Sequence, residues 1–274
     1  MQKKEKPNQD INTLPILPDG KSDTRYLNET EEWPNLVNRL GKPRIANHHF
    51  YLEVLDWIKQ KSNPDAFSFL DAGCGHGNDL RALRYELGGR GHFFGLDISK
   101  AEIMHGLAFY RATERAEEAI KMFGLGSLHD LQSIRVWDNQ EHDFTKIGMI
   151  TNETVDLIHM EAVLQASGYG HKAYAEKRES ALQTLKELAR VCKKGGKFLG
   201  RVSAFAPGVS KEKQFEILQA TGRWHFMPDA DELIMLLRVA GFDNIQRSIR
   251  QHEDAEKDVS KKDTVKVSFL AEKI

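Results

Sequence analysis

A glycine-rich turn between a short apolar run and a helical pattern constrains this chain more than any other feature. The run Phe67–Asp71 is followed by Gly73, Gly75 and Gly77, and the helical pattern begins at Asn78. Glycines at these positions permit positive φ angles and let a ligand approach the backbone closely. A short apolar run that ends in glycines is typical of a buried parallel strand, and the free amides at the start of the next helix favour a carboxylate or phosphate. The segment therefore predicts a strand, a ligand-binding turn and a helix in succession.

The rest of the chain alternates between strand and helix patterns. Short apolar runs predict seven strands, over residues 67–71, 92–97, 134–137, 154–158, 197–202, 245–249 and 265–271. Apolar residues at helical spacing predict helices over residues 78–87, 103–110, 182–192 and 229–240. Ser99 and Asp229 are the expected N-terminal caps of the second and fourth of these helices. We expect the helix over residues 182–192 to stop at Lys193–Gly196, where basic residues precede glycines. The alternation predicts an α/β fold built on a doubly wound sheet.

The last two predicted strands are joined by residues 250–263, which are charged and have no apolar residues at helical spacing. A parallel neighbour would need a crossover connection, usually with a packed helix. We therefore expect the final strand to run antiparallel, as the partner in a hairpin.

The charge and the distribution of apolar residues narrow the class of protein. The chain has 274 residues, with 39 Lys and Arg against 40 Asp and Glu, which gives a formal net charge of −1. A nucleic-acid-binding protein normally carries a strongly basic face, and an apolar run of about 20 residues is needed to span a bilayer. The sequence offers neither, so we expect no nucleic-acid partner and no membrane span.

The cysteines and the N-terminal residues indicate the compartment and the domain organisation. Cys74 and Cys192 are too few for a disulfide framework or for a zinc site made of cysteine pairs, and we expect no metal. The first residues lack the apolar stretch of a signal peptide, so we expect a cytoplasmic protein. Residues 1–24 predict a flexible arm, residues 25–62 a helical cap and residues 63–274 one ligand-binding domain. The arm could reach a neighbouring subunit, which leaves a homodimer open.

Two carboxylates indicate the class of ligand at the glycine turn. Asp97 ends the second predicted strand, where a carboxylate accepts hydrogen bonds from ribose hydroxyls. A dinucleotide-binding fingerprint requires glycine where this chain has Asn78. Asp71 precedes the first glycine by two positions, and its charge would repel a pyrophosphate but could hold an ammonium group. The residues therefore favour S-adenosylmethionine, a nucleoside with an amino-acid tail, over NAD.

These segments resemble those of class I S-adenosylmethionine-dependent methyltransferases. Leu70–Gly77 is similar to the family's first motif, and Phe94–Asp97 is similar to its ribose-binding strand end. Val136–Asp138 resembles the adenine-contacting segment, and Leu188–Gly196 resembles the lead-in to the fifth strand. The resemblance covers most of the chain from about Asn47 and implies a Rossmann-like sheet in the order 3-2-1-4-5-7-6, with the seventh strand antiparallel. It also implies that S-adenosylmethionine is bound by Asp71, Gly73, Cys74, Gly75, Gly77, Asp97, Ile98, Trp137, Asp138 and His159.

The end of the fourth predicted strand supplies the candidate catalytic residues. Val155–Glu161 resembles the family's fourth strand with its substrate-facing end. By strand alternation, His159 and Glu161 project the same way, near the carboxyl ends where ligands bind in open α/β sheets. His159 is a candidate proton acceptor, or else a structural residue whose carbonyl faces the cofactor's ammonium group. Glu161 is a candidate ligand of the cofactor or of a substrate amine.

Aromatic residues in the N-terminal cap and in the segment after the fifth strand suggest a small, partly apolar methyl acceptor, although each of them could serve packing alone. These residues include Trp33, Tyr51, Phe205, Phe215, Trp224 and Phe226. We therefore predict an enzyme that moves a methyl group from S-adenosylmethionine to an O, N or C atom of a small molecule. An NAD-linked oxidoreductase and a non-catalytic S-adenosylmethionine-binding protein of the same fold are the alternatives.

Overall fold

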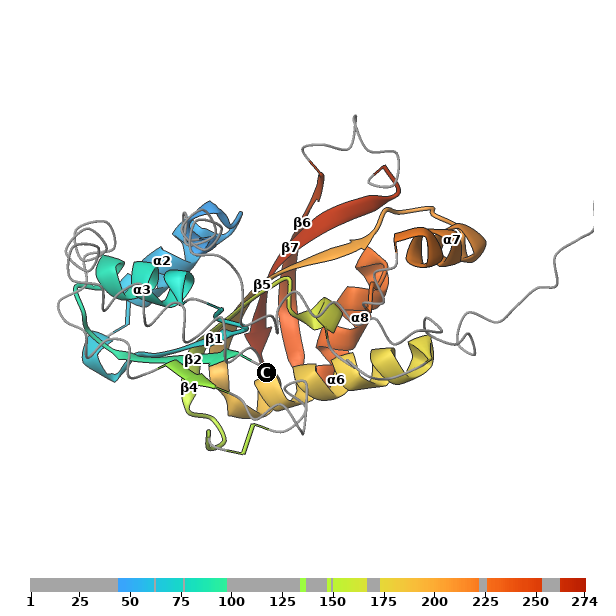
Figure 1. The fold of residues 1–274 in the computed structure, drawn as a ribbon. Coiled ribbons are helices and arrows are strands. Elements are labelled where there is room, and N and C mark those ends of the chain that lie inside the picture. Colours follow the sequence, from blue (N-terminus) through green and yellow to red (C-terminus); the bar gives the residue numbers. More distant parts are fainter. Residues whose placement is uncertain are drawn as a thin grey trace, which may run out of the picture.

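A computed structural model describes residues 44–61, 63–75, 77–97, 134–136, 147–148, 150–166, 173–221, 226–252 and 262–274. Within these residues, seven strands form one sheet in the order β3-β2-β1-β4-β5-β7-β6 (Figure 1). The strands are β1 (Ser68–Ala72), β2 (His92–Asp97), β3 (Ile134–Val136), β4 (Val155–Glu161), β5 (Cys192–Phe205), β6 (Phe242–Gln251) and β7 (Thr264–Lys273). The predicted fold class and strand order are confirmed.

Strand direction changes at one side of the sheet. The five strands from β3 to β5 run parallel to one another, whereas β7 pairs antiparallel with both β5 and β6. The antiparallel final strand predicted from the charged connection is therefore confirmed. The parallel strands place their carboxyl ends along one edge, which is where ligands bind in open α/β sheets.

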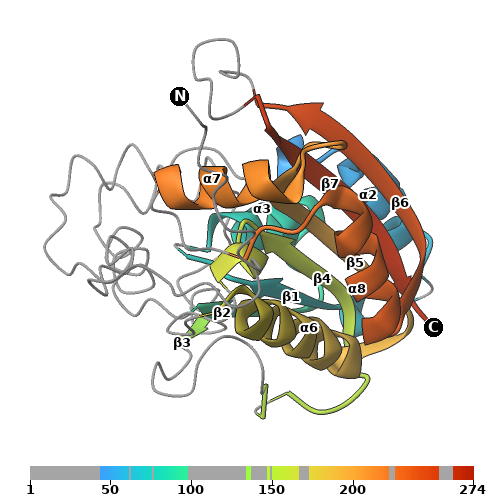
Figure 2. The same cartoon turned by 90° about the vertical axis from the view of Figure 1, so that its right-hand side faces the viewer.

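Helices cover both faces of the sheet, as expected of a doubly wound fold. The helical elements are η3 (Ile45–Asn47), α2 (Tyr51–Lys59), η4 (Pro64–Ala66), α3 (Asn78–Glu86), η6 (Leu164–Ala166), α6 (Tyr174–Val191), α7 (Lys211–Thr221) and α8 (Ala230–Ala240). Helices α2 and α3 pack on one face of the sheet, and α6 and α8 pack on the other (Figures 1 and 2). No described helix is long and apolar enough to cross a membrane.

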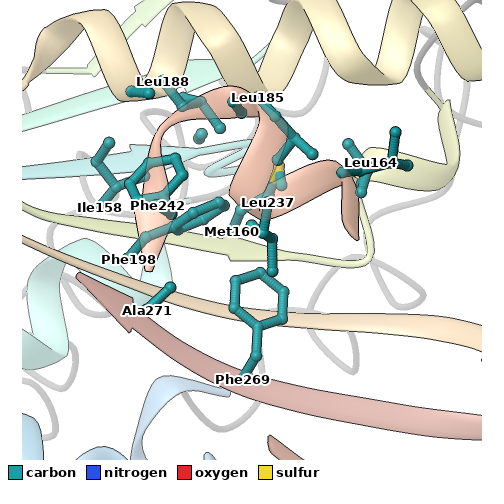
Figure 3. Packing of buried hydrophobic residues seen from close by; sticks show 14 of the residues in the cluster. Ile158, Met160, Leu164, Leu185, Leu188, Phe198, Leu237, Phe242, Phe269 and Ala271 are labelled. Atoms are coloured by element: carbon teal, nitrogen blue, oxygen red, sulfur yellow. The ribbon is translucent and has the colours of Figure 1, made fainter. Parts of the chain in front are cut away.

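Two apolar clusters fill the space between the sheet and these helix layers. The larger cluster joins α6 and α8 to the sheet, and Figure 3 shows Phe198, Phe242 and Phe269 packed at its centre. These three side chains are fully buried, and the Phe198 ring lies 5.1 Å from that of Phe242 and 5.0 Å from that of Phe269, between centroids. The second cluster packs η3, α2 and α3 against β1 and β2, so the N-terminal elements close the face that carries the glycine turn.

The long helix ends one residue before its predicted end at Cys192, and the predicted stop signal at Lys193–Gly196 does not cap it. Helix α6 ends at Val191, and Cys192 has an extended backbone and pairs with Val155 of β4. The next pairing joins Leu157 to Lys197, so the Lys-Lys-Gly-Gly stretch forms an irregularity within β5 and does not cap the helix. Pairing with β4 thus overrides the local stop signal. By contrast, the predicted cap of α8 is confirmed, because Asp229 accepts a hydrogen bond from the Glu232 N–H at 2.7 Å.

Several expectations fall outside the described residues. These are the N-terminal arm, the helix expected after Ser99 and three of the predicted cofactor ligands, namely Ile98, Trp137 and Asp138. Helix α7, which the sequence pattern did not predict, lies within the aromatic-containing segment after the fifth strand.

Candidate functional site

The turn after β1 is held against β2 by backbone hydrogen bonds. The N–H groups of Gly73 and Cys74 donate to the Leu96 carbonyl at 2.7 and 3.0 Å, and the Gly75 N–H donates to Asp97 Oδ2 at 2.7 Å. The three glycines of the turn have positive φ angles, +87° at Gly73, +49° at Gly75 and +76° at position 77. The structure thus brings the predicted sugar-binding carboxylate directly beside the glycine turn.

Two residues of the turn show how closely it is packed. A Cβ atom at Gly73 would overlap the side chain of Val163, which follows β4. The Cys74 side chain is buried and points toward β2, where its Sγ would lie 2.9 Å from a Cβ at Gly95. Because the Cys74 side chain is buried against β2, Cys74 could contact a ligand only through its backbone.

Asp71 and His159 form a buried pair between neighbouring strands. They are register partners in β1 and β4, and His159 Nδ1 lies 2.9 Å from Asp71 Oδ1. Their exposed fractions are 2% and 0%. Two of their polar atoms, Asp71 Oδ2 and His159 Nε2, have no hydrogen-bond partner among the described residues. A buried polar atom without a partner costs free energy, so these two atoms mark a position where a ligand or a proton is needed.

Asp79, in the first turn of α3, completes an acid–histidine cluster with Asp71 and His159. Each residue offers one polar atom, and these atoms lie within 4.8 Å of one another. Asp79 Oδ1 also accepts a hydrogen bond from the Ile45 N–H at 2.8 Å, which ties the N-terminal cap to the cluster. His159 Nδ1 is hydrogen-bonded to Asp71 in the described structure, so a metal ion bound through that atom would have to replace this hydrogen bond.

Burial and charge oppose each other within the cluster. Burial disfavours the charged imidazole of His159, but the hydrogen bond and charge of Asp71, with the charges of Asp79 and Glu161, outweigh it and raise its pKa. Burial also raises the pKa of Asp79, and the neighbouring charge of Asp71 adds to this effect, against the opposing charge of His159. The neighbouring acids therefore favour the charged form of His159, while burial and the charge of Asp71 favour the neutral form of Asp79.

His48 lies near the cluster and stays neutral. Its Nε2–H donates to the Gly200 carbonyl at 2.8 Å, and its Nδ1 accepts from the Phe50 N–H at 3.3 Å. Burial lowers its pKa to about 3, and the charges of His159 and Arg201 contribute. Both ring nitrogens are thus committed to backbone groups, and the role of His48 is to anchor the cap on β5.

Glu161 ends β4 and forms an ion pair with Arg201 on β5. Arg201 Nη1 lies 3.0 Å from Glu161 Oε1, and its Nη2 donates to the Asn47 carbonyl at 3.0 Å. The second carboxylate oxygen, Glu161 Oε2, is buried and has no partner among the described residues. The pair therefore presents an acceptor oxygen at the carboxyl edge of the sheet, one strand end from the glycine turn.

The structure brings most of the predicted site residues together and identifies two further residues beside them. Asp71, Gly73, Cys74, Gly75, Gly77, Asp97, His159 and Glu161 come from the ends of β1, β2 and β4 and from the turn after β1. Asp79 and Arg201 are additions, since the sequence analysis assigned neither a role. An acidic residue in the first turn of a helix is an ordinary feature, so the only signal for Asp79 was its position within the segment that follows the glycine turn.

A sequence model described as a methyltransferase domain matches residues 64–228, more than half of the chain. No curated protein sequence matches the chain.

Solved structures of similar fold include three methyltransferases. The geranyl diphosphate C-methyltransferase of Streptomyces coelicolor A3(2), in complex with Mg²⁺, geranyl diphosphate and S-adenosyl-L-homocysteine, is 14% identical, with a TM-score of 0.56 over 95% of this chain and 100% of that one. The arsenic(III) S-adenosylmethionine methyltransferase of Chlamydomonas reinhardtii is 16% identical, with a TM-score of 0.55 over 84% and 73%. The phosphoethanolamine N-methyltransferase 2 of Haemonchus contortus is 14% identical, with a TM-score of 0.53 over 81% of this chain; the match spans 52% of that protein. At these identities the similarity shows a shared fold.

Proposed function

This chain belongs to the family of S-adenosylmethionine-dependent methyltransferases, and we propose that it transfers the methyl group of that cofactor to a small-molecule acceptor. The observation that carries the proposal is the buried carboxylate oxygen Asp71 Oδ2, which lacks a partner beside a glycine turn. An ammonium group bound there would satisfy the oxygen and offset its charge. The pyrophosphate of NAD would instead place negative charge against Asp71, which disfavours the dinucleotide alternative.

Asp97 suits the sugar of the same ligand. Its Oδ2 already accepts the Gly75 N–H at 2.7 Å, so the carboxylate is fixed beside the backbone that would cradle the amino-acid tail. A carboxylate at the end of the second strand can accept hydrogen bonds from ribose hydroxyls. Asp71 would thus bind the amino-acid tail and Asp97 the ribose of the same nucleoside, with the glycine turn between the two carboxylates.

When bound, S-adenosylmethionine supplies a methyl group on a positively charged sulfur, which needs only an aligned nucleophile. The chain's own contribution is to hold and orient the reactants, and good orientation can lower a barrier by about 7–11 kcal/mol. A base is required only where the acceptor carries a proton that must leave. We propose that Glu161 Oε2, buried and without a described partner, accepts a hydrogen bond from an N–H or O–H of the acceptor.

His159 serves this site by position and not as the proton acceptor. Its ring is fully buried and its Nδ1 is hydrogen-bonded to Asp71, so the ring is not exposed to an acceptor molecule at the carboxyl edge. We therefore favour the structural alternative for His159. The structurally similar methyltransferases act on geranyl diphosphate, arsenic(III) and phosphoethanolamine, which supports a small acceptor here too.

The cofactor site is tested by calorimetric titration of the purified chain with S-adenosylmethionine and with S-adenosylhomocysteine. We expect both to bind, and Asp97→Ala to weaken binding by about 1–3 kcal/mol because polar groups lose their partner. Asp243→Ala is the matched control, since Asp243 lies on β6, away from the turn, and its side chain is 51% exposed. Folded protein that binds neither nucleoside would contradict the proposal.

A further inference from the structure

We propose that Gln165 is a positioning residue of the cofactor site, because its side chain holds a strained turn that keeps Val163 against the glycine turn. The strained turn is centred on Ala162, which directly follows β4. The inference rests on the proposed function only in that the cofactor binds at the glycine turn.

Ala162 has a backbone conformation that residues with a Cβ atom rarely adopt. Its φ angle is +58°, in the left-handed region where the Cβ crowds the backbone. Two other described residues besides glycine have a positive φ, namely Glu153, which precedes β4, and Asn244, near the start of β6. Of these three described residues, Ala162 is the one at the carboxyl edge, where ligands bind. Strain of this kind persists only where the surrounding contacts enforce it.

Hydrogen bonds on both sides of Ala162 enforce its conformation. The Ala162 N–H donates to the Arg201 carbonyl at 2.8 Å. The Ala162 carbonyl accepts from Gln165 Nε2 at 3.0 Å, and Gln165 Oε1 accepts from the N–H and the Oγ of Ser203, both at 3.0 Å, with the amide oriented to match donors with acceptors. Gln165 therefore ties the turn to β5 beyond Glu161, the last residue of β4 that pairs with that strand.

The turn at Ala162 decides where the next residue, Val163, lies. The Val163 side chain occupies the space that a Cβ atom at Gly73 would need, so it packs directly on the first glycine of the cofactor turn. Without the hydrogen bond from Gln165, Ala162 would relax toward an extended backbone and Val163 would move off Gly73. The cofactor would then have to order a looser turn when it binds, which weakens binding.

The test compares the affinity for S-adenosylhomocysteine among variants of the full chain, measured by calorimetric titration. Gln165→Leu keeps a side chain of similar size but removes its hydrogen bonds, and we expect it to weaken binding about three- to tenfold. Adding Ala162→Gly should restore most of the affinity, because glycine adopts the left-handed conformation without the bond from Gln165. Ala162 is exposed, so its replacement by glycine leaves no cavity.

The Ala162→Gly variant alone tests the strain. Glycine in an ordered segment usually destabilises a protein, but at a positive φ it relieves strain. We therefore expect a Tm at least as high as that of the wild type and an unchanged affinity for S-adenosylhomocysteine. A lower Tm would show that Ala162 is unstrained and would overturn the inference, which keeps it testable if Gln165→Leu does not fold.

A second glutamine separates this role from a merely structural one. Gln214, on α7, is buried, and its Nε2 donates to the Val209 carbonyl at 3.0 Å, so it too holds a backbone carbonyl. The matched control Gln214→Leu should lower Tm without changing the affinity for S-adenosylhomocysteine. Adding Ala162→Gly to this control should leave its affinity as it was.

The outcomes are distinguishable. If Gln165→Leu binds S-adenosylhomocysteine as tightly as the wild type, Gln165 does not position the cofactor site and the inference is overturned. A loss of affinity that Ala162→Gly does not restore would also overturn it, because the loss would then not pass through the strained turn. Both results leave the cofactor site intact, whereas failure of S-adenosylhomocysteine to bind the wild type would contradict the proposed function itself.

Discussion

Asp156, at the second position of β4, is predicted to be a principal stabilising residue although it lies at the opposite end of the strand from Glu161. Its carboxylate accepts hydrogen bonds from Lys193 Nζ at 2.6 Å, Lys61 Nζ at 2.7 Å, the Ser68 N–H at 3.0 Å and Ser68 Oγ at 2.8 Å. One side chain thus links β1, β4, the start of β5 and the segment after α2. We expect Asp156→Ala to remove the contacts among these four segments and so to lower the free energy of unfolding.

The size of the loss follows from the burial of these partners. The Ser68 N–H is buried, and leaving it unpaired costs about 1–3 kcal/mol. The two lysines are 28% and 37% exposed, so water screens them and each ion pair adds at most about 1 kcal/mol. We expect a loss of about 2–4 kcal/mol, or about 4–16 °C in Tm.

Urea unfolding followed by circular dichroism measures this loss. Asp243→Ala is the control, because its 3.7 Å ion pair with Arg238 is exposed and should contribute less than about 0.5 kcal/mol. If Asp156→Ala costs no more than Asp243→Ala, the reasoning is refuted.

The contribution of Asp156 also depends on pH. Burial opposes its charge, but the hydrogen bonds from Lys193, Lys61 and Ser68 outweigh it and lower its pKa. A carboxyl with a lowered folded-state pKa stabilises the protein above its unfolded pKa of about 3.9, and the stabilisation is lost as the pH falls through the folded-state value. The stability gap between the wild type and Asp156→Ala should therefore be constant above about pH 5 and shrink in acid.

Two further substitutions test the site. Gly73→Ala should lower both Tm and cofactor affinity, because the φ of +87° and the overlap with Val163 add strain. Gly208→Ala is the control, since its φ is +83° but the space around it is open, and it should lower Tm less. Equal losses of Tm in the two variants would refute the packing argument. Arg201→Gln should destabilise by about 2–3 kcal/mol, since it leaves the carboxylate of the mostly buried Glu161 without its ion-pair partner. Adding Glu161→Gln should recover part of the loss in the same unfolding assay, and no recovery would contradict the ion-pair assignment.

Features set by local patterns could be predicted from the sequence. The glycine turn, Asp71 and Asp97 lie where strand ends and helix starts force them, so their meeting follows from the alternation of strands and helices. The antiparallel β7 followed from the absence of a crossover helix.

Features set by pairing between distant segments could not be predicted. Helix α6 ended early because Cys192 pairs with Val155, which no local signal indicates. Asp79 joins the cluster because η3, distant in sequence, covers it and donates the Ile45 N–H. Arg201 faces Glu161 because of the register between β4 and β5, and that register includes an irregularity that an alternating pattern does not reveal.

The most direct test of the account is the structure of the complex with S-adenosylhomocysteine. We expect its ammonium nitrogen within about 2.7–3.2 Å of Asp71 Oδ2 and its ribose hydroxyls on Asp97. A complex in which the amino-acid tail lies away from Asp71, or in which the sugar does not reach Asp97, would contradict the account.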